Sequence, residues 1–437
     1  MNVPKRIAQA LINSLKGGVV PRVGLPYITV GRKAEIDALL HDVEIIADGG
    51  ASFRFIMGKY GSGKSFLLQT IRNFVMAKNF VVLDADLSPE RRLQGTRGQG
   101  LATYKELIRN ISTKTRPEGG ALSLILDRWI SSVQQQVMAE AGLSVTDPRL
   151  LGLVEKQISQ VIYSLNEMVH GFDFSRLLTL YYKAYTAGDD ELKAKILKWF
   201  RGEYGTKTEA RQELGVNIII TDDDWYEYLK ILAAFLKQAG YAGMLILIDE
   251  LVNIYKIPNA ITRQYNYEKI LTMYNDTMQG KAQHLGIILC GTPQCMEDPR
   301  RGVYSYEALR SRLAEGHFAG EHKDLLSPVI RLQPLTPEEM LILVEKLADI
   351  HAGLYGYTQI ITPEDMADFI RIEFERIGAN THITPREIIR DFIEVLDIIF
   401  QNPALTVREL LGSDRFTYAQ NAVAEEQTDG QFAEFTL

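Results

Sequence analysis

The sequence is poor in cysteine, and its two cysteines do not form a recognisable metal or redox motif. Cys290 and Cys295 lie close together in CGTPQC. This spacing suits neither a zinc knuckle nor a redox pair, and no second cysteine cluster exists in the chain. We therefore expect both cysteines to be structural residues without a metal-binding role.

Long apolar runs are also missing. Every apolar run is shorter than the roughly 18 residues that a membrane helix needs, and the amino terminus lacks the apolar core and cleavage site of a signal peptide. These absences predict a cytoplasmic protein that does not span a membrane. The 437 residues suffice for two or three domains, and the apolar and charged fractions of 46% and 24% are those of an ordinary globular protein.

An excess of positive charge is absent as well. The formal net charge is -7, so no protein-wide positive field attracts nucleic acid. Any contact with DNA or RNA therefore requires a local basic surface.

The stretch GKYGSGKS at residues 58–65 matches the phosphate-binding pattern G-x-x-x-x-G-K-S/T. The apolar run at residues 53–57 predicts a buried strand before this loop, and apolar positions at helical spacing over residues 65–77 predict a helix after it. Glycines let the backbone N–H groups turn inward around an anion, and the new helix points the positive end of its dipole at the same place. The sequence therefore predicts a nucleotide phosphate site rather than a flexible turn.

Two side chains of this loop have predicted chemical roles. We expect the Lys64 ammonium to reach the β- and γ-phosphates and the Ser65 hydroxyl to take one position on Mg²⁺. The nucleotide-binding residues predicted here are Gly58, Lys59, Tyr60, Gly61, Ser62, Gly63, Lys64, Ser65 and Phe66.

A second motif, MLILIDEL at residues 244–251, supplies two adjacent carboxylates. Its apolar residues predict a strand buried on both faces, as in a parallel sheet, and this strand ends at Asp249 and Glu250. We expect Asp249 to hold the Mg²⁺ shell and Glu250 to polarise a water for attack on the γ-phosphate. Small-molecule kinases usually lack the second carboxylate, and the sequence has no guanine-reading Asn/Thr-Lys-x-Asp stretch. ATP hydrolysis is therefore favoured over GTP hydrolysis.

Alternation of short apolar runs with helical stretches predicts the fold class, an α/β P-loop NTPase with a five-stranded parallel sheet. Helices are expected on both faces of the sheet, and the nucleotide at its carboxyl edge. Thr292 follows the fourth run, where its hydroxyl can lie beside the γ-phosphate and the attacking water; a simple turn at the end of a strand is the alternative. The five runs are residues 53–57, 80–83, 245–248, 286–290 and 329–332.

Residues 88 to 215, between the second and third predicted strands, exceed what a simple P-loop core requires and are predicted to be a helical insertion. Helical stretches are expected at residues 104–111, 121–141, 150–170 and 191–199. After the insertion, TDDDW at residues 221–225 predicts a threonine cap with carboxylates in the first turn of a helix.

The insertion begins with basic residues spaced among glycines, in LSPERRLQGTRGQGLATYKELIRN. A solvated polar face explains such a cluster, and a contact with nucleic acid or a partner protein is the alternative. The basic residues are Arg91, Arg92, Arg97, Lys105 and Arg109.

Three later segments begin with the same pattern of threonine, proline and acidic residues, at Thr336, Thr362 and Thr384. Each places threonine at the N-cap, proline at the first helical position and an acid two positions later, so each predicts a helix start. Together they predict a small helical domain after the sheet. Arg386 lies in a first turn, where the helix dipole disfavours a cation, so a bound phosphate or a surface carboxylate is expected to face it.

These residues together resemble the AAA+ ATPases, in the branch that includes the initiator and signalling ATPases. Thr292 matches the first sensor position of that class, and Arg386 in ITPREII matches the second-sensor arginine at the start of a lid helix. The stretch ITVGRKAEID resembles the one that packs against adenine, which implies that Val30, Gly31 and Arg32 take part in nucleotide binding.

The same resemblance implies that a neighbouring subunit supplies an arginine that neutralises charge in the transition state. EALRSRLAEG matches the usual location, so Arg312 or Arg310 is assigned this role. An ordinary pair of solvated arginines is the alternative.

Most of the chain also resembles the ATP-binding proteins of bacterial BREX-type phage-defence loci, in particular the BrxD-like group. GKYGSGKSF, VVLDADLSPERRL, ILIDELVNIYKI and CGTPQCMED carry this resemblance. It implies a cytoplasmic ATPase that self-associates and works beside a helicase or another defence component, with DNA as a possible partner.

The expected organisation has five parts. They are an N-terminal helical arm at 1–26, an ATPase core at 27–88 and 215–333, the helical insertion at 89–214, a helical lid at 334–402 and a partly disordered tail at 403–437.

Two functions are compatible with these motifs. In the first, a Mg²⁺-dependent ATPase couples ATP binding and hydrolysis to assembly and to action on DNA or a partner protein. In the second, a nucleotide-switched scaffold binds ATP, turns it over little, and recruits a helicase, nuclease or methyltransferase. We favour hydrolysis because a scaffold needs the phosphate loop but not a metal carboxylate, a base and a sensor together.

Overall fold

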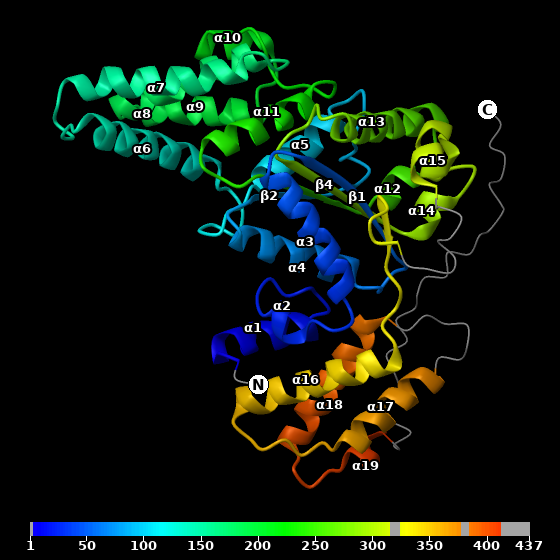
Figure 1. Ribbon diagram of the computed structural model, residues 1–437. Helices are drawn as coiled ribbons and strands as arrows, with labels where there is room; N and C mark the ends of the chain where they lie inside the picture. The colour runs from blue at the N-terminus through cyan, green and yellow to red at the C-terminus, as the bar shows by residue number, and fades with distance from the viewer. Residues whose placement is uncertain (1–2, 315–323, 377–383, 412–437) are drawn as a thin grey trace. The chain divides into compact units, whose positions relative to one another are not determined.

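The computed structural model describes residues 3–314, 324–376 and 384–411 of the chain (Figure 1). The chain divides into two compact units, one formed by Arg32–Pro334 and the other by Met1–Gly31 together with Leu335–Leu437. The predicted tail at residues 403–437 lies mostly outside the described residues, which end at residue 411.

The centre of the larger unit is a five-stranded sheet in which every pair of neighbouring strands is parallel. The strand order is β2-β3-β4-β1-β5. This arrangement confirms the predicted α/β class and the five-stranded parallel sheet. The strands are β1 (Ala51–Met57), β2 (Val81–Asp86), β3 (Met244–Asp249), β4 (Leu285–Gly291) and β5 (Val329–Arg331).

Both faces of the sheet are covered because side chains of alternate residues enter different apolar clusters. On one face, Ile56, Leu245 and Ile288 pack with α3 (Lys33–Ala47) and α4 (Lys64–Ala77). On the other face, neighbouring residues such as Phe55, Ile246 and Ile287 enter a larger cluster. That second cluster continues without a break into the helices between β2 and β3.

The chain between β2 and β3 is helical, and α8 was not predicted. The predicted helix at residues 150–170 ends earlier, at Leu165, and His170 takes a left-handed backbone conformation with φ 62°. A Cβ on Gly171 would lie 1.8 Å from the Leu165 carbonyl oxygen, so the tight turn needs glycine there. The helices are α5 (Gln99–Arg109), α6 (Leu122–Ala141), α7 (Arg149–Leu165), α8 (Gly171–Ala187), α9 (Asp190–Phe200), α10 (Lys207–Leu214) and α11 (Trp225–Gln238).

The rest of the larger unit consists of helices that follow β3 and β4. They are α12 (Val252–Tyr255), α13 (Ala260–Met278), α14 (Pro293–Glu297) and α15 (Glu307–Leu313), with the 3-10 turn η1 (Val303–Ser305).

The smaller unit is helical in its described part, and its first helix packs on α16 and α18. The expected caps are present: Thr336 with Glu339 and Thr384 with Glu387 form reciprocal capping boxes. Its helices are α1 (Lys5–Lys16), α2 (Leu25–Ile28), α16 (Pro337–Tyr355), α17 (Pro363–Arg376), α18 (Pro385–Gln401) and α19 (Val407–Leu411).

Candidate nucleotide-binding site

The loop between β1 and α4 has the backbone conformation that an anion cradle needs. Gly61 and Gly63 have φ angles of 77° and 87°, in the left-handed region that favours glycine. A Cβ on Gly58 would lie 2.2 Å from the Ser62 hydroxyl oxygen, so a side chain there would have to displace the Ser62 side chain. The Gly58 N–H donates to the Gly291 carbonyl at 3.1 Å, which ties the start of the loop to the end of β4.

Lys64 lies across this loop, at the first residue of α4. Its Nζ donates to the carbonyl oxygens of Gly58 at 2.7 Å and Lys59 at 3.0 Å. Burial lowers the pKa of Lys64, and the Asp249 carboxylate opposes that shift. Phosphate oxygens are stronger hydrogen-bond acceptors than these carbonyls. The Lys64 ammonium is therefore placed where it can donate to nucleotide phosphates instead of the carbonyls.

The two predicted motifs meet through one side-chain contact. The Ser65 hydroxyl donates to Oδ2 of Asp249, the last residue of β3, at 3.0 Å. A hydroxyl and a carboxylate are the kind of hard oxygen donors that Mg²⁺ prefers, so this pair fits the ion. In the described parts of the chain no three acidic, histidine or cysteine side chains cluster as a metal site.

Glu250 follows directly and has an unusual backbone, with φ 61°. Such a conformation costs a non-glycine residue energy and is common at functional sites. Its N–H donates to Asp249 Oδ1 at 2.8 Å. Burial, followed by the charges of Asp249 and Asp86, raises the pKa of Glu250. A carboxylate with a raised pKa is a stronger base than a solvated one, which suits the abstraction of a proton from water.

Asp86 is a third carboxylate at this edge, and the sequence analysis missed it. It ends β2 and pairs in register with Asp249. Burial and the charge of Asp249 raise its pKa. The signal was present in VVLDAD, a strand that ends in an acid, but only the pairing of β2 with β3 shows that this acid adjoins Asp249.

Thr292 lies where β4 ends, and β4 runs between β1 and β3. Its side chain therefore starts between the phosphate loop and the carboxylates. Its carbonyl accepts from the Cys295 N–H at 3.1 Å and from the Cys295 thiol at 3.0 Å. Both cysteines are buried and free of disulfides, and burial raises the pKa of Cys295 to about 11, which agrees with a structural role.

Comparison with known families decides the affiliation. The family model described as BREX system ATP-binding protein BrxC/D matches residues 3–415, nearly the whole chain. The chain belongs to this family. No curated protein matches the chain.

Membership of the BrxC/D family supports ATP as a ligand and links the protein to the BREX phage-defence system. Within the described residues, no helix has the length and apolar character needed to cross a membrane.

In this BrxC/D-family chain, Arg32 has a contact that the sequence analysis did not predict. Its guanidinium is buried, and Nη2 donates to the Ser62 carbonyl at 2.9 Å and to the Gln333 carbonyl at 2.7 Å. The arginine thus holds the phosphate loop to the segment after β5. Val30 and Gly31 belong to the other compact unit, so their predicted place beside adenine stays a prediction.

Replacing Arg32 with alanine leaves these two carbonyls without their donor. Each such bond to a charged group contributes about 1.5–3 kcal/mol. We expect Arg32→Ala to lower the melting temperature and to weaken ATP binding about tenfold, measured by differential scanning fluorimetry and calorimetric titration. Lys33→Ala, which removes an exposed cation at the next position, is the matched control. Unchanged ATP affinity in Arg32→Ala would show that the loop keeps its shape without this clamp.

The remaining predicted site residues lie away from the loop in sequence. Arg310 and Arg312 are exposed on α15, where Arg310 Nη2 lies 4.0 Å from Glu307 and Arg312 Nη1 donates to the Ala308 carbonyl at 2.7 Å. Arg386 is exposed in the first turn of α18, within the helical unit. Their roles as arginine finger and second sensor stay predictions.

Proposed function

We propose that this protein is a Mg²⁺-dependent ATP hydrolase of the AAA+ type that acts in a BREX-type phage-defence system. The observation that carries the proposal is the 3.0 Å hydrogen bond from Ser65 to Asp249, with Glu250 next in the chain. This contact joins the phosphate loop to Asp249, the first of the two adjacent carboxylates. A protein that only binds ATP needs the loop but has no use for a second carboxylate with a raised pKa.

In the proposed mechanism each residue has a distinct task. Lys64 exchanges the Gly58 and Lys59 carbonyls for phosphate oxygens when ATP binds. Ser65 and Asp249 hold Mg²⁺, which when bound neutralises charge on the phosphates. Glu250 accepts a proton from the attacking water, and Thr292 hydrogen-bonds near the γ-phosphate.

Turnover is coupled to assembly and to action on DNA or a partner protein, such as a helicase from the same defence system. Arg312 or Arg310 completes the active site of a neighbouring copy in this scheme, which their exposure on α15 permits. Arg386 is proposed as the residue that senses the γ-phosphate, on the strength of its match to the second-sensor arginine.

Metal removal provides the first test of hydrolysis. The purified protein is expected to release phosphate from ATP in Mg²⁺ and to lose that activity in EDTA, with recovery when Mg²⁺ is added back. The measurement is phosphate release, with nucleotide binding followed in parallel. Tight ATP binding in Mg²⁺ without any phosphate release would instead favour the nucleotide-switched scaffold.

A further inference from the structure

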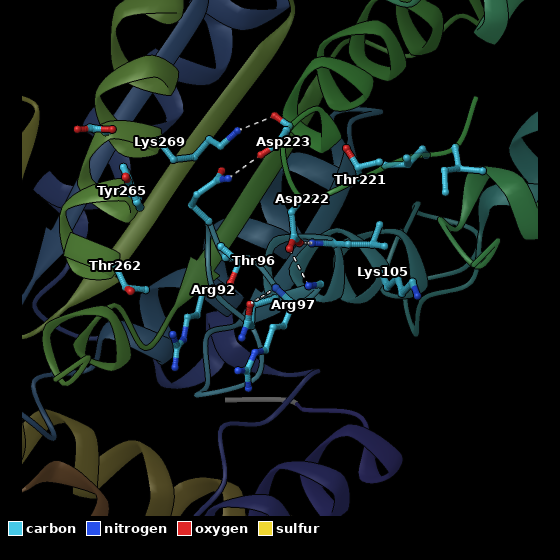
Figure 2. Close-up of a pocket in the computed structure, with 18 of the residues that line it drawn as sticks. Arg92, Thr96, Arg97, Lys105, Thr221, Asp222, Asp223, Thr262, Tyr265 and Lys269 are labelled. Carbon is cyan, nitrogen blue, oxygen red and sulfur yellow. Dashed lines mark hydrogen bonds between the residues drawn. The ribbon is translucent and has the colours of Figure 1, made fainter. Parts of the chain in front are cut away.

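The larger unit contains a cleft that is separate from the phosphate loop. This cleft has a volume of about 1050 Å³ and is lined by the loop at residues 92–99, the first turns of α5, residues 219–223 before α11, and α13. Figure 2 shows Arg92 and Arg97 on the loop, Lys105 on α5, and Tyr265 and Lys269 on α13. Its volume is at the upper limit for sites that enclose a small molecule.

Four cations line this cleft from three elements, namely Arg92, Arg97, Lys105 and Lys269. Across the described residues none of the four forms an ion pair with a carboxylate. The Arg92 Nε atom is buried and has no hydrogen-bond partner among the residues that the structure describes. Burial also lowers the pKa of Lys269. Asp222, Asp223 and Glu268 also line the cleft, so its four cations exceed its three acids by one. Lys269 Nζ donates to the Asp223 carbonyl at 2.9 Å, which leaves Arg92, Arg97 and Lys105 as the cations that favour an anionic ligand.

Two of the three acidic residues that line the cleft, Asp222 and Asp223, are already engaged in holding its walls; the third is Glu268. Asp222 accepts from the backbone N–H groups of Gly98 and Leu101, both at 2.7 Å. Asp223 Oδ1 accepts from Gln94 Nε2 at 2.9 Å. The prediction that this acidic stretch lies in the first turn of its own helix was therefore wrong, because α11 begins at Trp225 and Asp222 caps α5 instead.

The other wall is fixed in the same way. Asn266 Oδ1, on α13, accepts from the N–H groups of Leu93 and Gln94, both at 2.9 Å. Its Nδ2 donates to the Gln94 carbonyl at 3.0 Å. The loop with Arg92 and Arg97 is thus held from two sides, which makes the cleft a built site rather than a gap between loops.

We propose that this cleft binds a single strand of nucleic acid. Cations on three walls can follow a chain of phosphates, and the Tyr265 ring, 51% exposed on α13, offers a surface on which a base can stack. Gln99, Thr96 and Thr262 add polar groups to the lining. An acidic peptide would use the cations but gains nothing comparable from an exposed aromatic ring. The bases of a duplex are already paired and stacked, so a duplex could use the cations but would not stack a base on Tyr265.

The cleft is linked to the ATP site by a short segment after β2. The Leu87 N–H donates to the Asp249 carbonyl at 3.1 Å, and Asn253 Nδ2 donates to the Leu87 carbonyl at 2.8 Å. Arg91 Nε donates to the Asp86 carbonyl at 2.8 Å, directly before Arg92. Strand binding is therefore expected to change the rate of ATP turnover. This second effect rests on the proposed hydrolysis, whereas binding itself does not.

The test measures binding of a fluorescent oligothymidylate to the full chain by anisotropy over a range of salt concentrations. The variant Arg97→Ala/Lys105→Ala removes two exposed cations of the cleft. We expect at least about tenfold weaker binding, and a salt slope smaller by about 1.4, since each lost phosphate contact with a single strand removes about 0.7. Arg6→Ala/Lys156→Ala, an exposed pair outside the cleft, is the matched control and should bind as the wild type does.

A second variant separates stacking from charge. Tyr265→Ala is expected to weaken oligothymidylate binding about five- to 150-fold while leaving the salt slope unchanged. Equal binding by wild type and both variants would overturn the proposal. The proposal would also be overturned if polyglutamate competed for the site as strongly as an unlabelled oligonucleotide does. A preference for duplex DNA that Tyr265→Ala does not alter would overturn it as well.

ATP turnover is measured in the same samples. If the proposal holds, the oligonucleotide changes the wild-type rate, and Arg97→Ala/Lys105→Ala keeps its basal rate but loses that response. Intact binding with no turnover in any sample would contradict the proposed hydrolysis alone, so the two failures are distinguishable.

Discussion

Replacing Lys64 with alanine is expected to weaken ATP binding by at least about 100-fold. The ammonium bridges two carbonyls of the phosphate loop, at 2.7 and 3.0 Å, and is placed to donate to phosphate oxygens instead. Two charge-assisted hydrogen bonds contribute about 3–6 kcal/mol together, and every 1.4 kcal/mol is a factor of ten. Isothermal titration with ATP in Mg²⁺ measures the effect directly.

The matched control for this change is Lys78→Ala. Lys78 is exposed directly after α4, the helix that Lys64 begins, so its removal takes away one positive charge without touching the loop. We expect ATP affinity to stay at the wild-type level in the control. If Lys64→Ala bound ATP as tightly as Lys78→Ala does, the loop would not be the phosphate site.

Replacing Glu250 with glutamine is expected to lower ATP turnover by about 10²–10⁴-fold while ATP binding remains. The amide has nearly the same shape but cannot accept the proton from water. The native carboxylate is half-buried, and its partial burial with the charges of Asp249 and Asp86 raises its pKa, which suits a base. Single-turnover phosphate release measures the loss, and titration with ATP tests binding.

Glu118→Gln makes the same chemical change at an exposed position of the larger unit and should leave turnover unchanged. Wild-type turnover in Glu250→Gln would exclude this residue as the base. Asp86, the neighbouring carboxylate with a raised pKa, would then be the next residue to replace.

The features that the sequence predicted correctly are local ones. A glycine-rich loop between a strand and a helix, a buried strand and a capped helix each depend on residues a few positions apart, so their patterns are readable without the fold. Thr336 and Thr384 show this clearly. In each case the threonine side chain accepts from the backbone N–H of a glutamate three residues later, and that glutamate accepts from the threonine N–H. The missed helix α8 depended on a turn at His170 and Gly171 that no common dipeptide signal marks.

The roles that the sequence could not reveal depend on long-range contacts. Asp222 looked like part of a helix start, yet it caps α5, which lies much earlier in the chain. Its two partners, Gly98 and Leu101, are 124 and 121 residues away in the sequence. Arg32 matched a stretch associated with adenine, and the structure shows that its guanidinium also joins the Ser62 carbonyl of the phosphate loop to the Gln333 carbonyl after β5. In both cases the hydrogen-bond partner depends on how distant segments pack together. Residue type and local spacing in the sequence do not specify that packing.

By itself, the sequence determined the phosphate loop, the pair of acids after a buried strand, and the five parallel strands, because each follows from local spacing and apolar pattern. Only the tertiary structure decided which strands are neighbours, and hence that Ser65 meets Asp249 across 184 residues and that Asp86 joins them. It also assembled the cleft from four separate segments. The physical reason is that side chains on distant segments meet only once the sheet and its helices have packed together.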